Sequence, residues 1–415
     1  MTERVDTVVV GAGQAGLSMS YHLSQQNHEH LVLERSRIAE HWRSAVWDAF
    51  CLVTPNWTVQ LPGMAYDGPD PDGFMGRDAL VAHVERYAAY VNPPIRTGVA
   101  VTAVRPNGPA DGYSLDTTDG TVVARNVVIA TGGFQLPHLP RQSREFAASI
   151  HQIHSSEYRN PGELPDGAVL VVGTGQSGAQ IAEELYQSGR QVYLCVSRCG
   201  RVPRRYRGRD TMWWMVQMAI LDQPVDQIPI TARSGCNSHV SGKNGGHDLN
   251  LWQFARDGVV LLGRLEDAAD TKIRLADDLQ RNLHSADAAA ARIAERIDEF
   301  IAKTGIEAPQ QEPVEQHGGR TQVDAVSELD IAANGITTIV WATGYKHDFG
   351  WIHVPGICTD GKPIHRRGIT RFPGLYFLGL RQQRTLKSEL LLGVGSDAGF
   401  LADHIASGTA KIDQV

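Results

Sequence analysis

The sequence of 415 residues predicts an α/β fold with two similar domains. Two valine-rich stretches, 6–10 and 168–172, are typical of strands buried on both faces. Each runs into a glycine turn, Gly-Ala-Gly-Gln-Ala-Gly at 11–16 and Gly-Thr-Gly-Gln-Ser-Gly at 173–178. Strand, glycine turn and helix are the start of a Rossmann-like dinucleotide-binding domain. Because the chain is also too long for one ordinary core, we expect two such domains, one inserted in the other.

The first unit contains every element of this motif, from the glycine turn to the acidic residue at the end of the second strand. Gly11, Gly13 and Gly16 allow a tight turn, the approach of a pyrophosphate and the packing of a helix on the strand. The N-terminus of that helix favours a phosphate group. A second strand at 31–33 ends in Glu34, whose carboxylate suits a ribose diol. The unit therefore predicts a dinucleotide site, without distinguishing FAD from a nicotinamide coenzyme.

The second unit repeats this pattern with one difference. Gly173, Gly175 and Gly178 precede a helix and a strand at 192–196, and that strand ends in Ser197 and Arg198 without an acid. An arginine in place of a carboxylate suits a ribose 2′-phosphate, which favours NADPH over NADH. A solvated basic loop is the alternative for the arginines that follow the strand, which are Arg198, Arg201, Arg204, Arg205, Arg207 and Arg209.

The remaining elements indicate how the domains are connected. We expect a helix at 76–90, an antiparallel meander at 98–130, further strands at 336–341 and 375–379, and a last helix at 397–406. The first domain thus resumes after the second. We expect the first domain to comprise 1–165 and 331–415, and the inserted second domain, which carries a helical insertion, to comprise 166–330.

Three segments have more than one interpretation each. The aromatic stretch 210–218 suits a core helix, a substrate lid or a subunit contact. The glycine-rich loop 241–248 suits closure over a bound nicotinamide or an ordinary surface connection. Apolar residues at intervals of three and four over 275–301 predict a long amphipathic helix or a helix pair, ending near Gly305, with a homodimer contact as the alternative to core packing.

Composition excludes several classes of protein. The net charge of −7 argues against a general nucleic-acid binder, and no apolar run approaches the ~18 residues of a membrane span. The first strand follows Met1 too closely for a signal peptide, so we expect a cytoplasmic protein. We also expect free thiols and no metal site, because the cysteines are odd in number and widely spread: Cys51, Cys195, Cys199, Cys236 and Cys358.

Taken together, the motifs resemble those of the class B flavoprotein monooxygenases. These comprise flavin-containing monooxygenases, their plant auxin-forming relatives, and N-hydroxylating and Baeyer–Villiger enzymes. The resemblance spans nearly the whole chain. In detail the chain resembles a bacterial subgroup of flavin-dependent oxidoreductases. It rests on 11–16, Glu34, Trp42, Arg43, 130–132, 173–178, 196–198 and 342–345.

The resemblance implies two cofactors and their residues. FAD would lie at Gly11, Gly13 and Gly16, with Glu34 on the adenosine ribose. Trp42 and Arg43 would stand beside the flavin chain, and NADPH would lie at the second turn with Arg198 on its 2′-phosphate. Thr131-Gly132 and Thr343-Gly344 match the two links between the domains. The other residues expected at the cofactors are Gln14, Ala15, Arg35, Gln176, Ser177, Ser197 and Asp397.

The sequence departs from the family at three places. Ala39-Glu40 stands where a glycine pair is usual. A family fingerprint survives only as His154 and Tyr158, because Ala148 and Ile150 fill its first two positions, which disfavours a Baeyer–Villiger specialist. The asparagine that several relatives keep beside the flavin aligns near Thr54, with Asn56 two residues away.

The implied activity is a monooxygenase that transfers one oxygen atom from a C4a-peroxyflavin to a small substrate containing nitrogen, sulfur or a carbonyl. Dioxygen and NADPH would be co-substrates. Asn56, Thr54 and Gln60 are candidate hydrogen-bond donors in catalysis, with turn residues around Pro55 as the alternative. The other candidate functions are an NADPH oxidase or dehydrogenase and a non-catalytic NADP(H)-sensing flavoprotein. A flavin disulfide reductase would need a redox cysteine pair, which the sequence does not offer.

Overall fold

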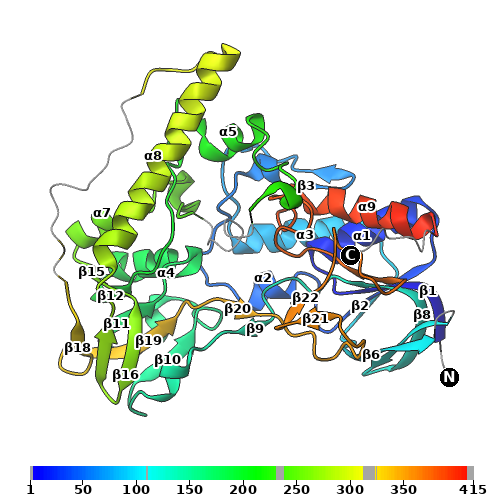
Figure 1. Cartoon of the computed structure of the whole chain (residues 1–415), viewed down its shortest axis with the longest axis horizontal. Helices are drawn as coiled ribbons and strands as arrows, with labels where there is room; N and C mark the ends of the chain where they lie inside the picture. Colours follow the sequence, from blue (N-terminus) through cyan, green and yellow to red (C-terminus); the bar gives the residue numbers. More distant parts are fainter. Residues whose placement is uncertain (1–2, 109–110, 230–237, 312–322, 324, 409–415) are drawn as a thin grey trace.

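The computed structural model describes residues 3–108, 111–229, 238–311, 323 and 325–408. It shows a mixed α/β fold in which two sheets stand side by side, each with its own helices (Figure 1). The prediction of an α/β fold is confirmed at this level.

The first sheet has the strand order β5-β2-β1-β8-β7-β6, and β23 pairs with β8. β1, β2, β5, β8 and β23 run parallel to one another, whereas β7 is antiparallel to β8 and β6 to β7, which gives the expected meander. Its last strand comes from the C-terminal part of the chain, as expected. The strands are β1 (Glu3–Val10), β2 (His30–Glu34), β5 (Ile95–Thr97), β6 (Val101–Gly108), β7 (Gly112–Thr117), β8 (Gly120–Ile129) and β23 (Leu375–Phe377).

Three helices pack with this sheet. They are α1 (Gln14–Gln25), α3 (Arg77–Val91) and α9 (Val394–Ala406), and α1 contacts both of the others. Their fully buried side chains include Leu17, Val84 and Leu401, which join one core cluster. The α1 helix therefore leaves the carboxyl end of β1 with one face fixed in the core and its N-terminus at the sheet edge.

The second sheet is parallel throughout, with the order β10-β19-β11-β12-β15. The helices α4 (Gln176–Gln187) and α7 (Leu251–Arg256) pack in its core with the first turns of α8 (Leu279–Thr304). Two of the strands, β10 and β19, lie outside the range 166–330 predicted for the inserted domain. The strands are β10 (His151–His154), β11 (Ala168–Val172), β12 (Val192–Cys195), β15 (Val260–Leu262) and β19 (Ile336–Trp341).

The amphipathic pattern at 275–301 is one helix, α8 (Leu279–Thr304), and not a helix pair. It begins four residues later than the pattern because 272–275 form strand β17. Gly305, with φ of 72°, ends the helix in the left-handed conformation that glycine adopts at low cost. Its lower turns pack on the second sheet, and its upper turns extend beyond the body of the molecule toward α5 (Figure 1).

The remaining elements are short. A three-stranded antiparallel sheet is formed by β16 (Leu265–Ala269), β17 (Lys272–Leu275) and β18 (Glu328–Asp330). Paired two-residue strands are β3 (Gln60–Leu61) with β4 (Met64–Ala65), β9 (Leu136–Pro137) with β20 (Tyr345–Lys346), β13 (Arg205–Tyr206) with β14 (Arg209–Asp210), and β21 (Cys358–Thr359) with β22 (Lys362–Pro363). Short helices are α2 (Glu40–Ser44), α5 (Thr211–Gln217), and 3-10 turns at Asn56–Thr58, Arg141–Arg144, Pro161–Glu163, Val225–Gln227 and Lys243–Gly245.

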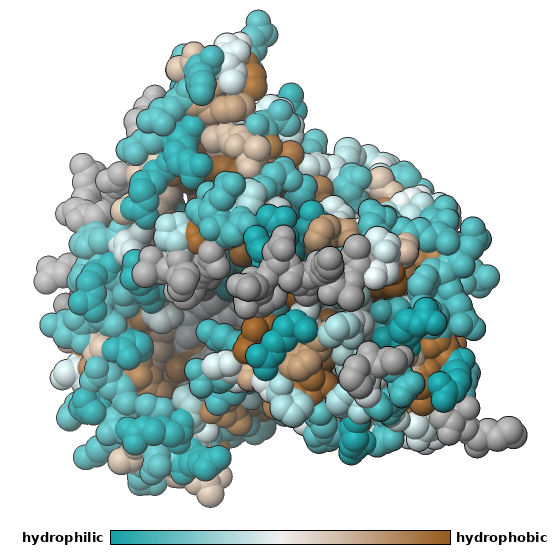
Figure 2. All heavy atoms as spheres, turned by 45° about the vertical axis from the view of Figure 1, so that its right-hand side comes forward, coloured by the Kyte–Doolittle hydropathy of each residue, from teal (hydrophilic) through white to brown (hydrophobic). Residues whose placement is uncertain are grey.

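The surface drawn in Figure 2 is mostly hydrophilic, with apolar residues in small separate groups. Within the described ranges, no helix is long and apolar enough to cross a membrane. Cys51, Cys195 and Cys358 are free thiols, as expected, but Cys199 is disulfide-bonded, so the prediction of free thiols is wrong for this residue. Cys236 lies outside the described residues.

Candidate dinucleotide sites

The first glycine turn is shaped by backbone contacts at two of its glycines. A Cβ on Gly11 would lie 2.7 Å from the Ala130 carbonyl oxygen, and the residue has φ of 109°. A Cβ on Gly16 would lie 1.8 Å from the Gly11 carbonyl oxygen. Around a Cβ on Gly13, by contrast, no heavy atom of the described residues lies within 4 Å. Gly11 and Gly16 therefore serve the turn itself, whereas Gly13 borders open space.

The second turn reproduces these distances. A Cβ on Gly173 would lie 2.6 Å from the Ala342 carbonyl oxygen, and one on Gly178 would lie 1.9 Å from the Gly173 carbonyl oxygen. A Cβ on Gly175 again meets no described heavy atom within 4 Å. The internal repeat predicted from the sequence is therefore a repeat in backbone geometry.

The open glycines stand at the N-termini of α1 and α4. In neither helix, as described, does a side chain cap the N-terminus or an acid occupy the first turn. The first backbone N–H groups thus remain available, and the helix dipole favours an anion beside them. An uncapped N-terminus beside an open glycine fits the pyrophosphate of a dinucleotide at both places.

The ends of the second strands differ between the units. The Glu34 carboxylate accepts hydrogen bonds from the Ala12 N–H at 2.8 Å and the Ser36 N–H at 2.9 Å. The Gly11 N–H donates to the Leu33 carbonyl in the first unit, and the Gly173 N–H donates to the Cys195 carbonyl in the second. These equivalent hydrogen bonds align the two units, so Val196 occupies the position that corresponds to Glu34. Val196 is buried and apolar. The turn is held here by Thr174, whose hydroxyl accepts a hydrogen bond from the Ser197 N–H at 2.9 Å.

Three of the six arginines after β12 form ion pairs within the structure. Arg201 is buried with its Nε 2.9 Å from Asp287, and Arg204 is buried with Nη2 2.6 Å from Asp210. Arg207 pairs with Asp298 at 2.7 Å. The interpretation of these residues as a solvated basic loop or as phosphate ligands is therefore wrong. Arg198 is exposed and lies two residues beyond Val196, at the end of β12.

The two predicted links lie together. The Gln135 amide donates to the Thr131 hydroxyl and the Gly132 carbonyl, both at 2.8 Å. The Thr343 hydroxyl donates to the His138 carbonyl, which ties the second link to the segment after the first. His154 Nε2 lies 3.0 Å from the Gly344 carbonyl oxygen, and burial lowers the pKa of this histidine. These contacts hold the two crossings between the sheets side by side.

Trp42 and Arg43 lie on α2, which follows Ala39 in a left-handed conformation with φ of 59°. The Trp42 ring packs against both main core clusters, with its centroid 5.5 Å from that of Phe50. Arg43 forms an ion pair with Glu85 of α3. The pair thus joins the two halves of the molecule near the first turn, and its contact with flavin stays a prediction.

Two of the three candidate catalytic residues use their side chains to bind backbone groups of the loop around Pro55. The Asn56 side chain donates to the Asp70 carbonyl at 2.9 Å and accepts from the Met75 N–H at 2.7 Å, and it is buried. The Gln60 amide donates to the Trp57 carbonyl at 2.6 Å and is exposed. These contacts place Asn56 and Gln60 in the turns around Pro55, and their catalytic roles stay predictions. Thr54 is half-buried, and its catalytic role stays a prediction.

A segment from the C-terminal part of the chain, 379–397, contacts the helix that follows the first turn. Gly379 faces α1, where an added Cβ would lie 2.7 Å from the Ala15 Cβ. Asp397 in the first turn of α9 is buried, and its Oδ1 lies 3.2 Å from Arg384 Nη1. Burial raises the pKa of Asp397 to about 6. The sequence predicts Asp397 at the cofactors, and its contact with a cofactor stays a prediction.

The loop predicted at 241–248 contacts the second turn. His239, just before it, is 1% exposed and places Nε2 against the Thr174 carbonyl. His247 Nε2 lies 2.6 Å from Glu183 of α4, and this hydrogen bond raises the pKa of the histidine. An added Cβ on Gly242 would lie 1.9 Å from the Leu52 carbonyl oxygen, so the loop also touches the first unit. The loop is therefore packed between the two units, and its closure over a nicotinamide stays a prediction.

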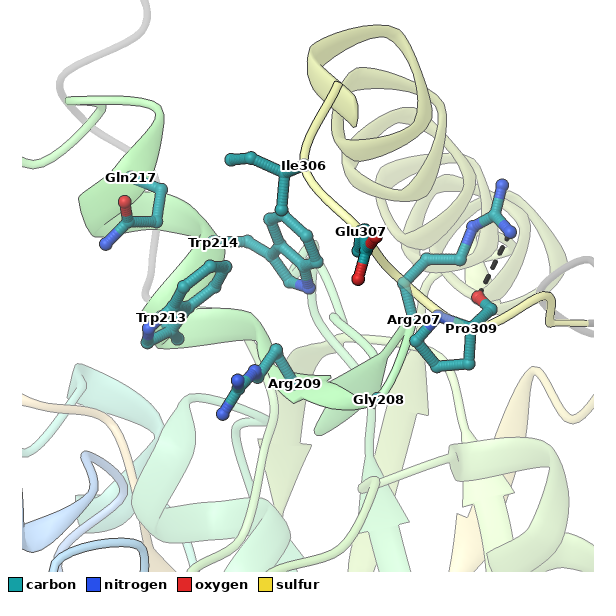
Figure 3. A pocket seen from close by; sticks show the side chains of 9 residues that line it. All are labelled: Arg207, Gly208, Arg209, Trp213, Trp214, Gln217, Ile306, Glu307 and Pro309. Atoms are coloured by element: carbon teal, nitrogen blue, oxygen red, sulfur yellow. Dashed lines mark hydrogen bonds between the residues drawn. The ribbon is translucent and has the colours of Figure 1, made fainter. Parts of the chain in front are cut away.

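A separate cavity of about 540 Å³ lies between α5 and the segment after α8 (Figure 3). Trp214 is fully buried behind it, as the interpretation of a core helix requires, and its indole N–H donates to the Tyr206 carbonyl at 2.7 Å. Trp213 lines the opening, with Arg209 5.3 Å from the centre of its ring. None of the predicted cofactor residues lines this cavity.

Comparison with known proteins supports the reading of the two turns. Residues 8–207 match the family model described as pyridine nucleotide-disulphide oxidoreductase. An uncharacterized CzcO-like oxidoreductase of Geobacillus kaustophilus is 32% identical over 98% of this chain and 99% of its own length. The rice indole-3-pyruvate monooxygenase YUCCA1 is 31% identical over 96% of this chain and 90% of its own. A flavin-containing monooxygenase from Stenotrophomonas maltophilia shares the fold, with a TM-score of 0.67 at 18% identity over 98% of this chain and 99% of that one.

Proposed function

The chain belongs to the family of flavin-dependent oxidoreductases that includes CzcO-like oxidoreductases and YUCCA monooxygenases, and we propose that it is an FAD- and NADPH-dependent monooxygenase. The membership confirms the resemblance predicted from the motifs and makes the protein an oxidoreductase. In the proposed reaction one atom of dioxygen enters a small organic substrate at nitrogen, sulfur or a carbonyl group. The other atom leaves as water, and NADPH and a proton supply the reducing equivalents.

We assign FAD to the first turn. The N-terminus of α1 and the open space at Gly13 would bind its pyrophosphate, and Glu34 would accept hydrogen bonds from its ribose. Glu34 is already oriented by the Ala12 and Ser36 N–H groups, so its carboxylate needs no rearrangement. When bound, FAD supplies hydride acceptance and the activation of dioxygen.

We assign NADPH to the second turn. Val196 removes the acid that would repel a 2′-phosphate, and Arg198 would pair with that phosphate. The description of the matching family as pyridine nucleotide oxidoreductases supports a nicotinamide coenzyme here. The contrast between Glu34 and Val196 at corresponding positions carries the assignment of the two cofactors.

The domain division remains a proposal. We retain an NADPH domain inserted in an FAD domain, but the pairing of β10 and β19 favours boundaries near 150 and 342 instead of 165 and 330. We further propose a cytoplasmic protein whose partners are a small-molecule substrate and dioxygen. A homodimer through the exposed face of α8 is the alternative to a monomer.

The fate of oxygen tests the proposed activity. The FAD-bound protein, reduced with one equivalent of NADPH under nitrogen, is mixed with ¹⁸O₂ and a panel of amines, sulfides and ketones. We expect an ¹⁸O-labelled product from one substrate class and a delay before the oxidised flavin spectrum returns. Immediate reoxidation with one hydrogen peroxide per NADPH and no labelled product would identify an oxidase instead. Failure of NADPH to reduce the flavin would favour the NADP(H)-sensing alternative.

A further inference from the structure

Gln14 and Gln176 occupy the same position in the two repeated units. Each is the first residue of its helix, directly after the open glycine of its turn. Each donates a side-chain N–H to a backbone carbonyl far away in the sequence. Gln14 bonds the Glu389 carbonyl at 2.7 Å, and Gln176 bonds the Val240 carbonyl.

The segment that Gln14 holds is anchored on the first unit. It runs from Gly379, which packs on Ala15, to the start of α9. Arg384 within it reaches Asp397 at 3.2 Å. Gln14 therefore joins the N-terminus of α1 to a segment supplied by the C-terminal part of the chain.

The segment that Gln176 holds is anchored on the second unit in the same manner. His239 binds the Thr174 carbonyl of the turn, and His247 binds Glu183 of α4 at 2.6 Å. Between these contacts, Val240 accepts the hydrogen bond from Gln176. The two glutamines thus perform the same task with segments that are unrelated in sequence.

The oxygen atom of each side-chain amide indicates that the residue contacts a ligand. Gln14 Oε1 and Gln176 Oε1 are both buried and have no hydrogen-bond partner among the described residues. An unsatisfied buried acceptor is costly, and native structures contain few of them. That the same atom is left open at both repeated positions, each time next to an open glycine, indicates that it is satisfied when the adjacent site is filled.

We propose that Gln14 and Gln176 are positioning residues, each of which holds a remote chain segment against its own bound dinucleotide. This inference rests on the proposed function. Gln14 acts for the adenine dinucleotide of the first turn, and Gln176 for the nicotinamide coenzyme of the second. The amide N–H fixes the segment, and Oε1 accepts a hydrogen bond from a hydroxyl of the nucleotide or from a water bound to it.

The test uses Gln14→Met and Gln176→Met, which keep the length of the side chain and remove its hydrogen bonds. Each variant is the control for the other. FAD retained after desalting and the Kd for NADPH, measured anaerobically on FAD-loaded protein, are compared with wild type. We expect Gln14→Met to weaken FAD retention and Gln176→Met to raise the Kd for NADPH, each by about two- to tenfold, the worth of one hydrogen bond. The ligand at the other turn is bound as in wild type.

A second readout follows the segment itself. Trypsin cleavage after Lys243 should be faster in Gln176→Met, and NADPH should protect this bond less than in wild type. If either methionine variant fails to fold, Gln14→Asn and Gln176→Asn replace it, because the shorter amide does not reach the carbonyl.

Four outcomes are distinguishable. Selective losses support the proposal. Folded variants that bind both ligands as wild type does overturn it while leaving the proposed function intact. Equal losses of both ligands in either variant also overturn it, since they show a general structural role. A wild-type protein that binds neither FAD nor NADPH overturns the proposed function and this inference together.

Discussion

Each turn contains a glycine that borders open space and a glycine that packs against backbone, and we expect substitution by alanine to affect these two glycines in opposite ways. Gly175 has φ of −68° and no described heavy atom within 4 Å of an added Cβ. Gly175→Ala should therefore fold normally, and its reduced unfolded-state entropy stabilises the protein by about 0.4–1 kcal/mol. In a chain of this size the change in Tm is about 1–3 °C at most.

Coenzyme binding should respond quite differently. If the NADPH pyrophosphate lies against Gly175, the new methyl group occupies its place. Wild type at a coenzyme concentration of 100 Kd gains about 2.7 kcal/mol from binding. We expect Gly175→Ala to lose most of this gain, so that NADPH no longer raises its Tm, while FAD retention stays unchanged.

Gly178→Ala is the matched control. Its Cβ would lie 1.9 Å from the Gly173 carbonyl oxygen, so the backbone must shift and the variant should lose about 1–3 kcal/mol of stability. Thermal unfolding of both variants with and without NADPH separates a ligand glycine from a structural one. A folded Gly175→Ala protein that NADPH stabilises as well as wild type would refute the placement of the pyrophosphate.

Three further predictions follow from other contacts. Arg198→Ala should raise the Kd for NADPH at least tenfold more than that for NADH in anaerobic titrations, and equal losses would contradict the 2′-phosphate assignment. Glu183 raises the pKa of His247, so this contact stabilises the fold fully below pH 6.5 and is lost as the pH rises through the elevated pKa. Between pH 6.5 and the raised pKa of His247, Tm should therefore fall in wild type and fall less steeply in His247→Gln. Parallel curves of Tm against pH would show that this contact does not stabilise the fold. Leu170→Ala in the centre of β11 should cost about 2–5 kcal/mol in urea unfolding because Leu170 is fully buried. A cost below 1 kcal/mol would be inconsistent with the packing described.

The sequence predicted the parts of the site that local pattern determines. Apolar runs and glycine spacing predict both glycine turns, the position of Glu34 and the return of the chain to the first sheet at 375–377. These features depend on residues that are close together in the sequence. The repeat in sequence is matched by the repeat in backbone contacts, from Gly11 with Ala130 to Gly173 with Ala342.

The parts that depend on distant partners were not predictable. Arg201 and Arg207 resemble phosphate ligands in sequence, but their carboxylate partners stand on α8, about 90 residues later. Gln14 and Gln176 reach backbone carbonyls, which carry no residue identity that a sequence pattern reveals. The position of β10 in the second sheet depends likewise on its pairing with β19, more than 180 residues away.

We infer that the two turns bring FAD and NADPH into contact for hydride transfer. Anaerobic mixing of the FAD-loaded protein with NADPH tests it most directly. We expect flavin absorbance near 450 nm to be lost with one NADPH per flavin, and to be lost more slowly in Gly175→Ala at the same coenzyme concentration. Flavin that stays oxidised in the presence of saturating NADPH would contradict the claim.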